Sequence, residues 1–245
     1  MTAAVVNGNP QARVWLFDFD NTLSALEKQV DWAASRRELE SFLRAEGIDE
    51  AIFREFPSRN LPLYNALLMR RLDGSRNVTE LMRQASAIIE SYELRGVEHA
   101  DPLPGAIELL FALHARNKHI AIVTSNSSRT VTCWLARHHL TLEVGTIVGR
   151  DSLLPLKPAP EMVRRALELS HGSAPEAILI GDSEADLHAA HRADVGFFGI
   201  AANLDARTRL KALGAREIFS SPGELARHLS LSGFPPKNID ERRLR

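Results

Sequence analysis

The sequence has a single cysteine among 245 residues, almost no net charge and no long apolar run. Because Cys133 has no second cysteine to pair with, an internal disulfide framework and a cysteine-based zinc site are both excluded. The formal net charge of −1 gives no overall field that would attract nucleic acid or an anionic membrane surface. No apolar run approaches the roughly 18 residues that a membrane-spanning helix needs. We therefore expect a cytoplasmic protein that binds neither nucleic acid nor membranes.

The length suits one large α/β domain, or a core domain with a smaller insertion, and it allows a substantial buried core. Residues 1–12 lack the basic start and the apolar segment of a secretory signal. No feature of the sequence indicates an oligomeric state.

Four short apolar runs are typical of strands that are covered on both faces of a parallel sheet. They are Val14 to Phe17, Ile120 to Val123, Ile178 to Ile180 and Val195 to Ile200. Helical patterns alternate with or follow these runs at residues 104–115, 161–169, 185–193 and 222–229. This alternation predicts an α/β fold with a doubly wound, mostly parallel, Rossmann-like sheet.

Between Ser24 and His99 the pattern changes to amphipathic helices without a convincing strand. Helical segments begin near Trp32, Asn60 and Val78. We predict a helical cap domain at residues 24–99, inserted into a catalytic core formed by residues 1–23 and 100–232. Residues 233–245 are expected to be a C-terminal tail.

Polar side chains follow three of the predicted strands, at the sheet edge where such folds collect their ligands. The first strand runs into Asp18-Phe19-Asp20-Asn21-Thr22, the second into Thr124-Ser125-Asn126, and the third into Gly181-Asp182, with Asp186 shortly after. Lys157 lies in a proline-flanked turn before a predicted helix. Because prolines restrict the backbone there, the turn can hold the lysine charge in a fixed direction.

These residue types suit phosphoryl chemistry. A carboxylate can attack phosphorus, and a second carboxyl two residues later can serve as general acid and base. Hydroxyl, amide and backbone N–H groups at a strand-to-helix junction can hold phosphate oxygens, and magnesium prefers hard oxygen ligands. Each motif alone has a simpler interpretation, as a strand end, a helix cap or a solvated lysine.

In this order, the motifs resemble those of the haloacid dehalogenase-like hydrolase superfamily. The matching residues are Asp18, Asp20 and Thr22, then Thr124, then Lys157, and finally Asp182 and Asp186. The likeness is greatest to the phosphoglycolate phosphatase-like branch, whose helical cap lies between the first and second motifs. The resemblance implies a phosphatase that acts through an aspartyl-phosphate intermediate.

The resemblance also implies a role for each acid. Asp18 would be the nucleophile, and Asp20 would protonate the leaving oxygen and then activate water. The Asp18 carboxylate, the Asp20 backbone carbonyl and Asp182 would hold Mg²⁺. Asp186 would orient Lys157 or a metal-bound water.

For the phosphoryl group, the resemblance implies binding by Thr124 and Lys157, with Ser125 and Asn126 as further candidates. The expected partner is a small phosphorylated metabolite. Arginines of the predicted cap suit contact with a second anionic group of that metabolite, although any one of them can simply be solvated. These arginines are Arg54, Arg59, Arg70, Arg71 and Arg76.

Other functions remain open. Asp20 and Asp182 argue against a dehalogenase, which has no use for the magnesium ligands. Lys28 lies too close to the first motif to be the Schiff-base lysine of a phosphonatase. A sugar phosphomutase carries the same motifs, and a non-catalytic binding protein can retain the fold without its activity.

Overall fold

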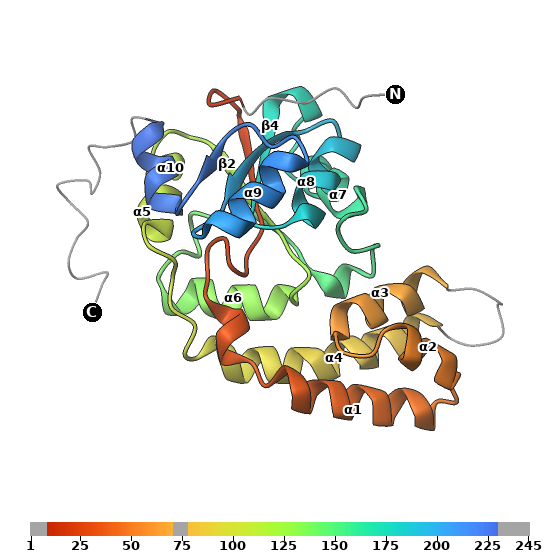
Figure 1. The fold of residues 1–245 in the computed structure, drawn as a ribbon. Coiled ribbons are helices and arrows are strands. Elements are labelled where there is room, and N and C mark those ends of the chain that lie inside the picture. The colour runs from red at the N-terminus through yellow and green to blue at the C-terminus, as the bar shows by residue number, and fades with distance from the viewer. Residues whose placement is uncertain (1–8, 71–77, 230–245) are drawn as a thin grey trace.

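The computed structural model describes residues 9–70 and 78–229 and contains a six-stranded parallel sheet with the strand order β3-β2-β1-β4-β5-β6 (Figure 1). The strands are β1 (Val14–Phe17), β2 (His119–Val123), β3 (Thr146–Val148), β4 (Ala177–Gly181), β5 (Gly196–Ile200) and β6 (Ile218–Phe219). Since β1 lies between β2 and β4, the segments that follow these three strands leave the sheet side by side.

The register of the strands brings the predicted motifs to one edge. Phe17, the last residue of β1, lies opposite Ile122 on β2 and Ile180 on β4. The chain therefore leaves all three strands within about two residues of the same level, as parallel pairing requires. Asp18 continues the ladder, because its backbone N–H donates to the Ile180 carbonyl at 2.8 Å.

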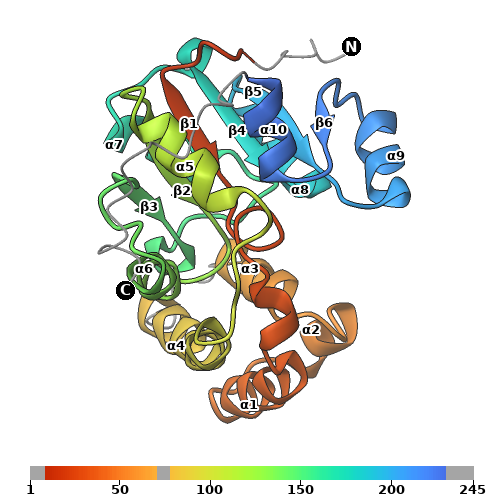
Figure 2. The same cartoon turned by 90° about the vertical axis from the view of Figure 1, so that its left-hand side faces the viewer.

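Helices cover both faces of the sheet because side chains along β1 alternate between two apolar clusters. Trp15 and Phe17 pack with α5 (Ala106–His114), α6 (Ser128–Arg137) and α10 (Pro222–His228). Val14 and Leu16 pack on the side of α7 (Glu161–Leu169) and α8 (Glu184–Arg192). Figure 2 shows α5 and α10 on the face toward the viewer. The remaining core helices are α7 (Glu161–Leu169), α8 (Glu184–Arg192) and α9 (Leu204–Ala212), with short 3-10 helices η2 (Arg150–Ser152) and η3 (Ala174–Glu176).

Four helices in the described residues between β1 and α5 form the cap, which lies beyond the carboxyl edge of the sheet in Figure 1. They are α1 (Trp32–Ala45), α2 (Glu50–Glu55), α3 (Asn60–Met69) and α4 (Val78–Val97), and the 3-10 helix η1 (Leu26–Gln29) leads into them. Asp31 caps α1, since its Oδ1 accepts from the Ala34 N–H at 2.8 Å. An aspartate at this position satisfies a backbone donor that the first turn of a helix leaves free.

The predicted fold class, a doubly wound parallel sheet with a helical insertion, is confirmed. The sequence did not predict β3 or β6, which are only three and two residues long, nor α2 and α9. Helix α5 begins at Ala106 rather than Pro104, because Gly105 at its N-cap has a left-handed φ of 83°. A Cβ at Gly105 would lie 2.2 Å from the Gly223 Cα, so only glycine allows this approach.

The exact domain boundaries stay predictions, and the predicted tail at 233–245 falls outside the described residues. Within the described ranges, no helix combines the length and the apolar character needed to cross a membrane.

Candidate active site

The turn after β1 places two carboxylates at the sheet edge. Asp18 is buried, with 9% of its surface exposed, and Asp20 is partly buried. The Asp20 Oδ1 accepts from the Glu27 backbone N–H at 2.9 Å, which ties the carboxylate to the start of the cap. Asn21 takes a left-handed φ of 59° and its N–H donates to the Ser24 carbonyl, so the chain reverses tightly here.

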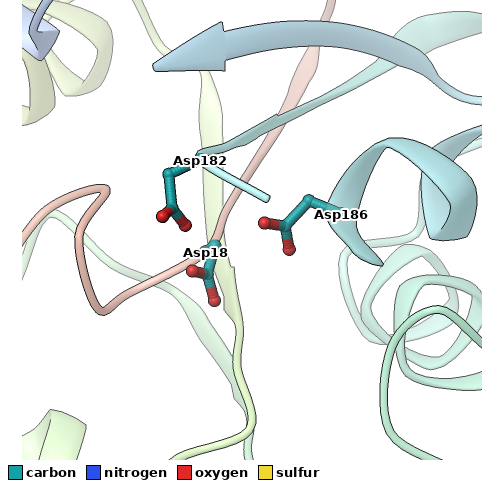
Figure 3. A group of neighbouring side chains, drawn as sticks. All are labelled: Asp18, Asp182 and Asp186. Carbon is teal, nitrogen blue, oxygen red and sulfur yellow. The ribbon is translucent and has the colours of Figure 1, made fainter. Parts of the chain in front are cut away.

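Three carboxylates, two that follow adjacent strands and one on the first turn of α8, converge on one point. Oxygens of Asp18, Asp182 and Asp186 lie within 4.8 Å of one another, and Figure 3 shows the three side chains facing a common space. Gly181 allows this closeness, because a Cβ at Gly181 would lie 2.5 Å from the Asp186 Cβ. A glycine at the end of β4 thus lets α8 bring Asp186 against the strand.

Lys157 reaches into this acidic group. Its Nζ lies 2.6 Å from the Asp18 Oδ1, 2.5 Å from the Asp186 Oδ1 and 2.8 Å from the Val123 carbonyl oxygen, and its side chain is only 4% exposed. The other Asp186 oxygen accepts from the backbone N–H and the hydroxyl of Ser183, at 3.1 and 2.5 Å, in the capping box of α8. Both oxygens of Asp186 are therefore engaged, and their geometry fixes the ammonium group.

The environment raises the pKa values of three of the acids. Burial raises the pKa of Asp18 to about 6, against the opposing attraction of the Lys157 ammonium. Burial raises the pKa of Asp20 to about 7, although the Glu27 N–H partly offsets this. Burial, with the charges of Asp18 and Asp186, raises the pKa of Asp182 to about 8. For Lys157 burial works against the charge, but Asp18 and Asp186 outweigh it and raise the pKa.

The donor set fits a divalent cation that prefers oxygen. Asp18 and Asp182 offer carboxylate oxygens that lie close together. Their negative charges repel each other, so a cation between them would be stabilised. Asp186 is less suited as a direct ligand, because Lys157 and Ser183 already occupy its oxygens. A cation between Asp18 and Asp182 would remove the repulsion and lower the pKa of each.

The loop after β2 is held by hydrogen bonds of its own. The Thr124 hydroxyl donates to the Asn126 Oδ1 at 3.0 Å and accepts from the Asn126 N–H at 3.1 Å. The Asn126 Nδ2 donates to Glu93 at 3.1 Å, so both ends of this amide are engaged inside the protein. Ser127 caps α6 by accepting from the Thr130 N–H. Ser125 is partly exposed and lines the cavity described next.

A cavity of about 940 Å³ joins the motifs to the cap. All the predicted site residues line it: Asp18, Asp20, Thr124, Ser125, Asn126, Lys157, Asp182 and Asp186. From the cap it is lined by Trp32, Phe56, Arg59 and Asn65, among others. Asn65 also joins cap to core, since its Oδ1 accepts from the Leu156 N–H at 2.9 Å.

The arginines predicted for the cap differ in their position relative to the cavity. Arg59 lines the cavity, whereas Arg70 is an exposed residue outside its lining and pairs with Glu55 at 2.6 Å. Arg54 is exposed on α2 and is also outside the lining. Arg71 and Arg76 lie outside the described residues.

Sequence reasoning missed two buried charges beside the loop, Glu93 of α4 and Arg150 of η2. No motif or spacing in the sequence links them, because they are far apart in the chain and each sits in an otherwise ordinary segment. Only the fold reveals that they meet next to Asn126.

The fold and the site together define a Rossmann-like hydrolase whose acids and lysine meet under a helical cap. The family model of haloacid dehalogenase-like hydrolases matches residues 15–200, and the chain belongs to this family. The predicted membership and the predicted phosphatase class are thereby confirmed.

Relatives of known name support this assignment. A phosphoglycolate phosphatase of Vibrio cholerae is 27% identical over 190 residues, which cover 75% of this chain and 82% of the relative. A solved haloacid dehalogenase-like hydrolase from Bacteroides fragilis has a TM-score of 0.64 at 20% identity, covering 87% of this chain and 99% of that one. A mutant of CbbY from Rhodobacter sphaeroides, solved with xylulose-(1,5)bisphosphate, has a TM-score of 0.60 at 20% identity, covering 87% and 96%.

Proposed function

We propose that the chain is a magnesium-dependent phosphatase that hydrolyses a small phosphomonoester through an aspartyl phosphate on Asp18. The observation that carries this proposal is the placement of Asp18, which lines the cavity in contact with the Lys157 ammonium and close to Asp182. Asp20, with a pKa of about 7, adds a carboxyl group suited to exchanging protons near neutral pH.

The reaction has two displacements at phosphorus. In the first, a carboxylate oxygen of Asp18 forms a bond to phosphorus while the ester P–O bond breaks, and Asp20 gives its proton to the leaving oxygen. In the second, the Asp20 carboxylate takes a proton from a water molecule, whose oxygen attacks phosphorus. The bond between phosphorus and Asp18 breaks, which releases inorganic phosphate and restores the nucleophile.

Magnesium would be held by the carboxylates of Asp18 and Asp182 and by the backbone carbonyl of Asp20. When bound, it supplies positive charge against the phosphoryl oxygens and relieves the repulsion between the acids. Asp186 keeps the Lys157 ammonium in place through the contact at 2.5 Å.

The transferring phosphoryl group would be bound by Lys157 and by the loop after β2. Thr124 and Asn126 hold each other, which leaves Ser125 as the residue of this loop whose side chain is most open to a ligand. Phosphoryl transfer spreads negative charge over the equatorial oxygens, so a fixed ammonium group and aligned donors stabilise the transition state.

The substrate is proposed to be a small phosphorylated metabolite with a second anionic group. Relatives are named for phosphoglycolate, and the CbbY mutant was solved with a bisphosphate, so both of the named compounds carry two acidic groups. In this chain Arg59 lines the cap side of the cavity, where a guanidinium suits a carboxylate or a second phosphate.

The test is hydrolysis of p-nitrophenyl phosphate with and without Mg²⁺. We expect turnover that requires magnesium and disappears in Asp18→Asn, because the amide is not a nucleophile. Asp182→Asn should need more magnesium to reach half-maximal activity. An Asp18→Asn protein with near wild-type turnover would refute the proposal.

Two alternatives give different results in the same assay series. A non-catalytic protein would release no phosphate from any substrate in a screen of phosphorylated metabolites. A sugar phosphomutase would move phosphate between positions of a sugar phosphate and release little of it to water.

A further inference from the structure

A buried ion pair joins the cap to the core beside the phosphoryl site. Glu93 lies on α4 of the cap and Arg150 on η2 of the core, and both side chains are 0% exposed. The guanidinium donates to both carboxylate oxygens, from Nη1 to Oε1 at 2.7 Å and from Nη2 to Oε2 at 3.1 Å. The two-point contact fixes the relative orientation of the side chains.

Glu93 is also the acceptor for the loop after β2 and for the first turn of α6. Its carboxylate accepts from the Asn126 Nδ2, the Ser127 N–H and the Thr130 hydroxyl, each at 3.1 Å. One carboxylate from the cap thus holds three donors of the segment that carries Ser125 and Thr124.

Arg150 holds the same loop from the other side. Its Nη1 donates to the Ser125 carbonyl at 2.8 Å, and its backbone N–H donates to the Asn126 carbonyl at 2.8 Å. The guanidinium also reaches back to the cap, where its Nε donates to the Ser86 hydroxyl at 3.1 Å. The carbonyl groups of Ser125 and Asn126 are therefore held toward Arg150.

Stability alone is a weak reason for this arrangement. Removing two charges from water is expensive, and well-packed apolar residues of similar volume often stabilise a protein as well or better. What apolar residues do not supply is a set of directed hydrogen bonds to both the amide and the carbonyl groups of one loop.

We propose that Glu93 and Arg150 are positioning residues for phosphoryl binding, which fix loop 124–127 and attach it to α4 of the cap. They touch no substrate themselves and act through Thr124, Ser125 and Asn126. The inference rests on the proposed function, since it takes loop 124–127 as the phosphoryl subsite. Every substrate shares the transferring phosphoryl group, so the effect is independent of the leaving group.

The main test uses the double variant Glu93→Gln/Arg150→Met, which removes both charges together and leaves no buried charge unpaired. Inorganic phosphate binding to the Mg²⁺ form is measured by calorimetry, and kcat and KM are measured with p-nitrophenyl phosphate and with a larger phosphomonoester. We expect the phosphate Kd to rise about tenfold or more, as for the loss of one or two buried hydrogen bonds. The ratio kcat/KM should fall by the same factor for both substrates.

A matched control separates positioning from stability. Leu43→Ala removes a buried apolar side chain from α1 and leaves a packing defect in the cap. Leu43 does not line the cavity. It should lower Tm while leaving the phosphate Kd unchanged. A double variant with lowered Tm and wild-type phosphate Kd would therefore behave like Leu43→Ala and would overturn the inference.

Arg150→Lys provides the test if the double variant does not fold. It keeps a positive charge beside Glu93 but lacks the planar fork that reaches Glu93 and Ser125 together. We expect a phosphate Kd raised about threefold or more, even where Leu43→Ala lowers Tm as much and leaves Kd unchanged, and an unchanged Kd for Arg150→Lys would overturn the inference. Phosphate binding by a wild-type protein that hydrolyses nothing would instead count against the proposed function, while the Kd comparison would still test the positioning residues.

Discussion

At the residue scale, Lys157 determines how the charges of the site balance. Its ammonium contacts Asp18 and Asp186 at 2.6 and 2.5 Å, and it is almost fully buried. Without it, the acids that meet at the ends of β1 and β4 would face one another with no positive group among the described side chains at that point. The lysine thus serves both the free protein and, by the proposal, the phosphoryl group.

Lys157→Ala should lower kcat by roughly 10²- to 10⁴-fold, the range for losing one preorganised charge contact to a transition state. Lys157→Arg should restore little, because a longer planar fork does not fit between two carboxylates and the Val123 carbonyl. Turnover of p-nitrophenyl phosphate at saturating Mg²⁺ checks this. Lys211→Ala, on the exposed surface of α9, is the control and should be as active as wild type. Equal kcat values for all four proteins would contradict the role of Lys157.

The raised pKa values predict how the metal-free protein responds to pH. Asp18, Asp20 and Asp182 titrate at about 6, 7 and 8 in the folded state, well above the ordinary aspartate value of 3.8. From about pH 4 to 8 the folded state therefore holds protons that the unfolded state has released. The free energy of unfolding should fall as pH rises through this interval.

Magnesium should reverse this trend, since it binds the ionised acids of the folded state. We expect the increase of Tm on adding Mg²⁺ to a chelator-treated sample to be larger at pH 8 than at pH 5. Asp182→Asn, which removes one proposed ligand, should reduce the increase. A magnesium effect that is the same at both pH values would count against the acidic cluster as the metal site.

At the element scale, the ends of strands β1, β2 and β4 were predictable from sequence, because each is a compact apolar run followed at once by polar residues. These three strands end at the same edge of the sheet, and all eight predicted site residues line one cavity. The short strands β3 and β6 gave no comparable signal, since two or three apolar residues are common in loops. Their place in the sheet follows from pairing with β2 and β5.

The contacts between elements were beyond the sequence for a different reason. Glu93 looks like an ordinary acidic residue of an amphipathic helix, and Arg150 like a loop residue. Their burial depends on how α4 packs against η2 and α6, which no spacing in the sequence encodes. The cap arginines also appeared equivalent in sequence, and only the fold distinguishes Arg59 from Arg70.

Arg59→Ala should lower kcat/KM for a preferred metabolite with a second anionic group, while leaving p-nitrophenyl phosphate nearly unaffected. The nitrophenyl group of that substrate carries no net charge, so it gives the guanidinium no anionic group to pair with. Arg70→Ala is the matched control, because Arg70 pairs with Glu55 outside the cavity, and it should change neither substrate. If Arg59→Ala does not separate the two substrates, anion selection by this side chain is wrong.

At the scale of the whole molecule, the cap and the core contribute different surfaces to one cavity. The core supplies the carboxylates, the lysine and the loop after β2, whereas the cap supplies Arg59, Trp32 and Phe56. The cap lies beyond the carboxyl edge of the sheet (Figure 1), and residues of both parts line the cavity that holds the acids. By the proposed mechanism, a cap at this position would limit the access of water to the first displacement and strengthen the charge contacts.

The most direct test of the account is whether Asp18 carries the phosphoryl group during turnover. Asp20→Asn removes the base that takes a proton from the attacking water, so the second displacement should be slow. Because p-nitrophenolate leaves without needing a proton, the first displacement should continue and the aspartyl phosphate should accumulate. The reaction is quenched in acid, digested with pepsin and analysed by mass spectrometry. The account predicts one phosphate on Asp18, absent when Asp18→Asn is added. Phosphate on another residue, or an active enzyme that never carries phosphate on Asp18, would contradict it.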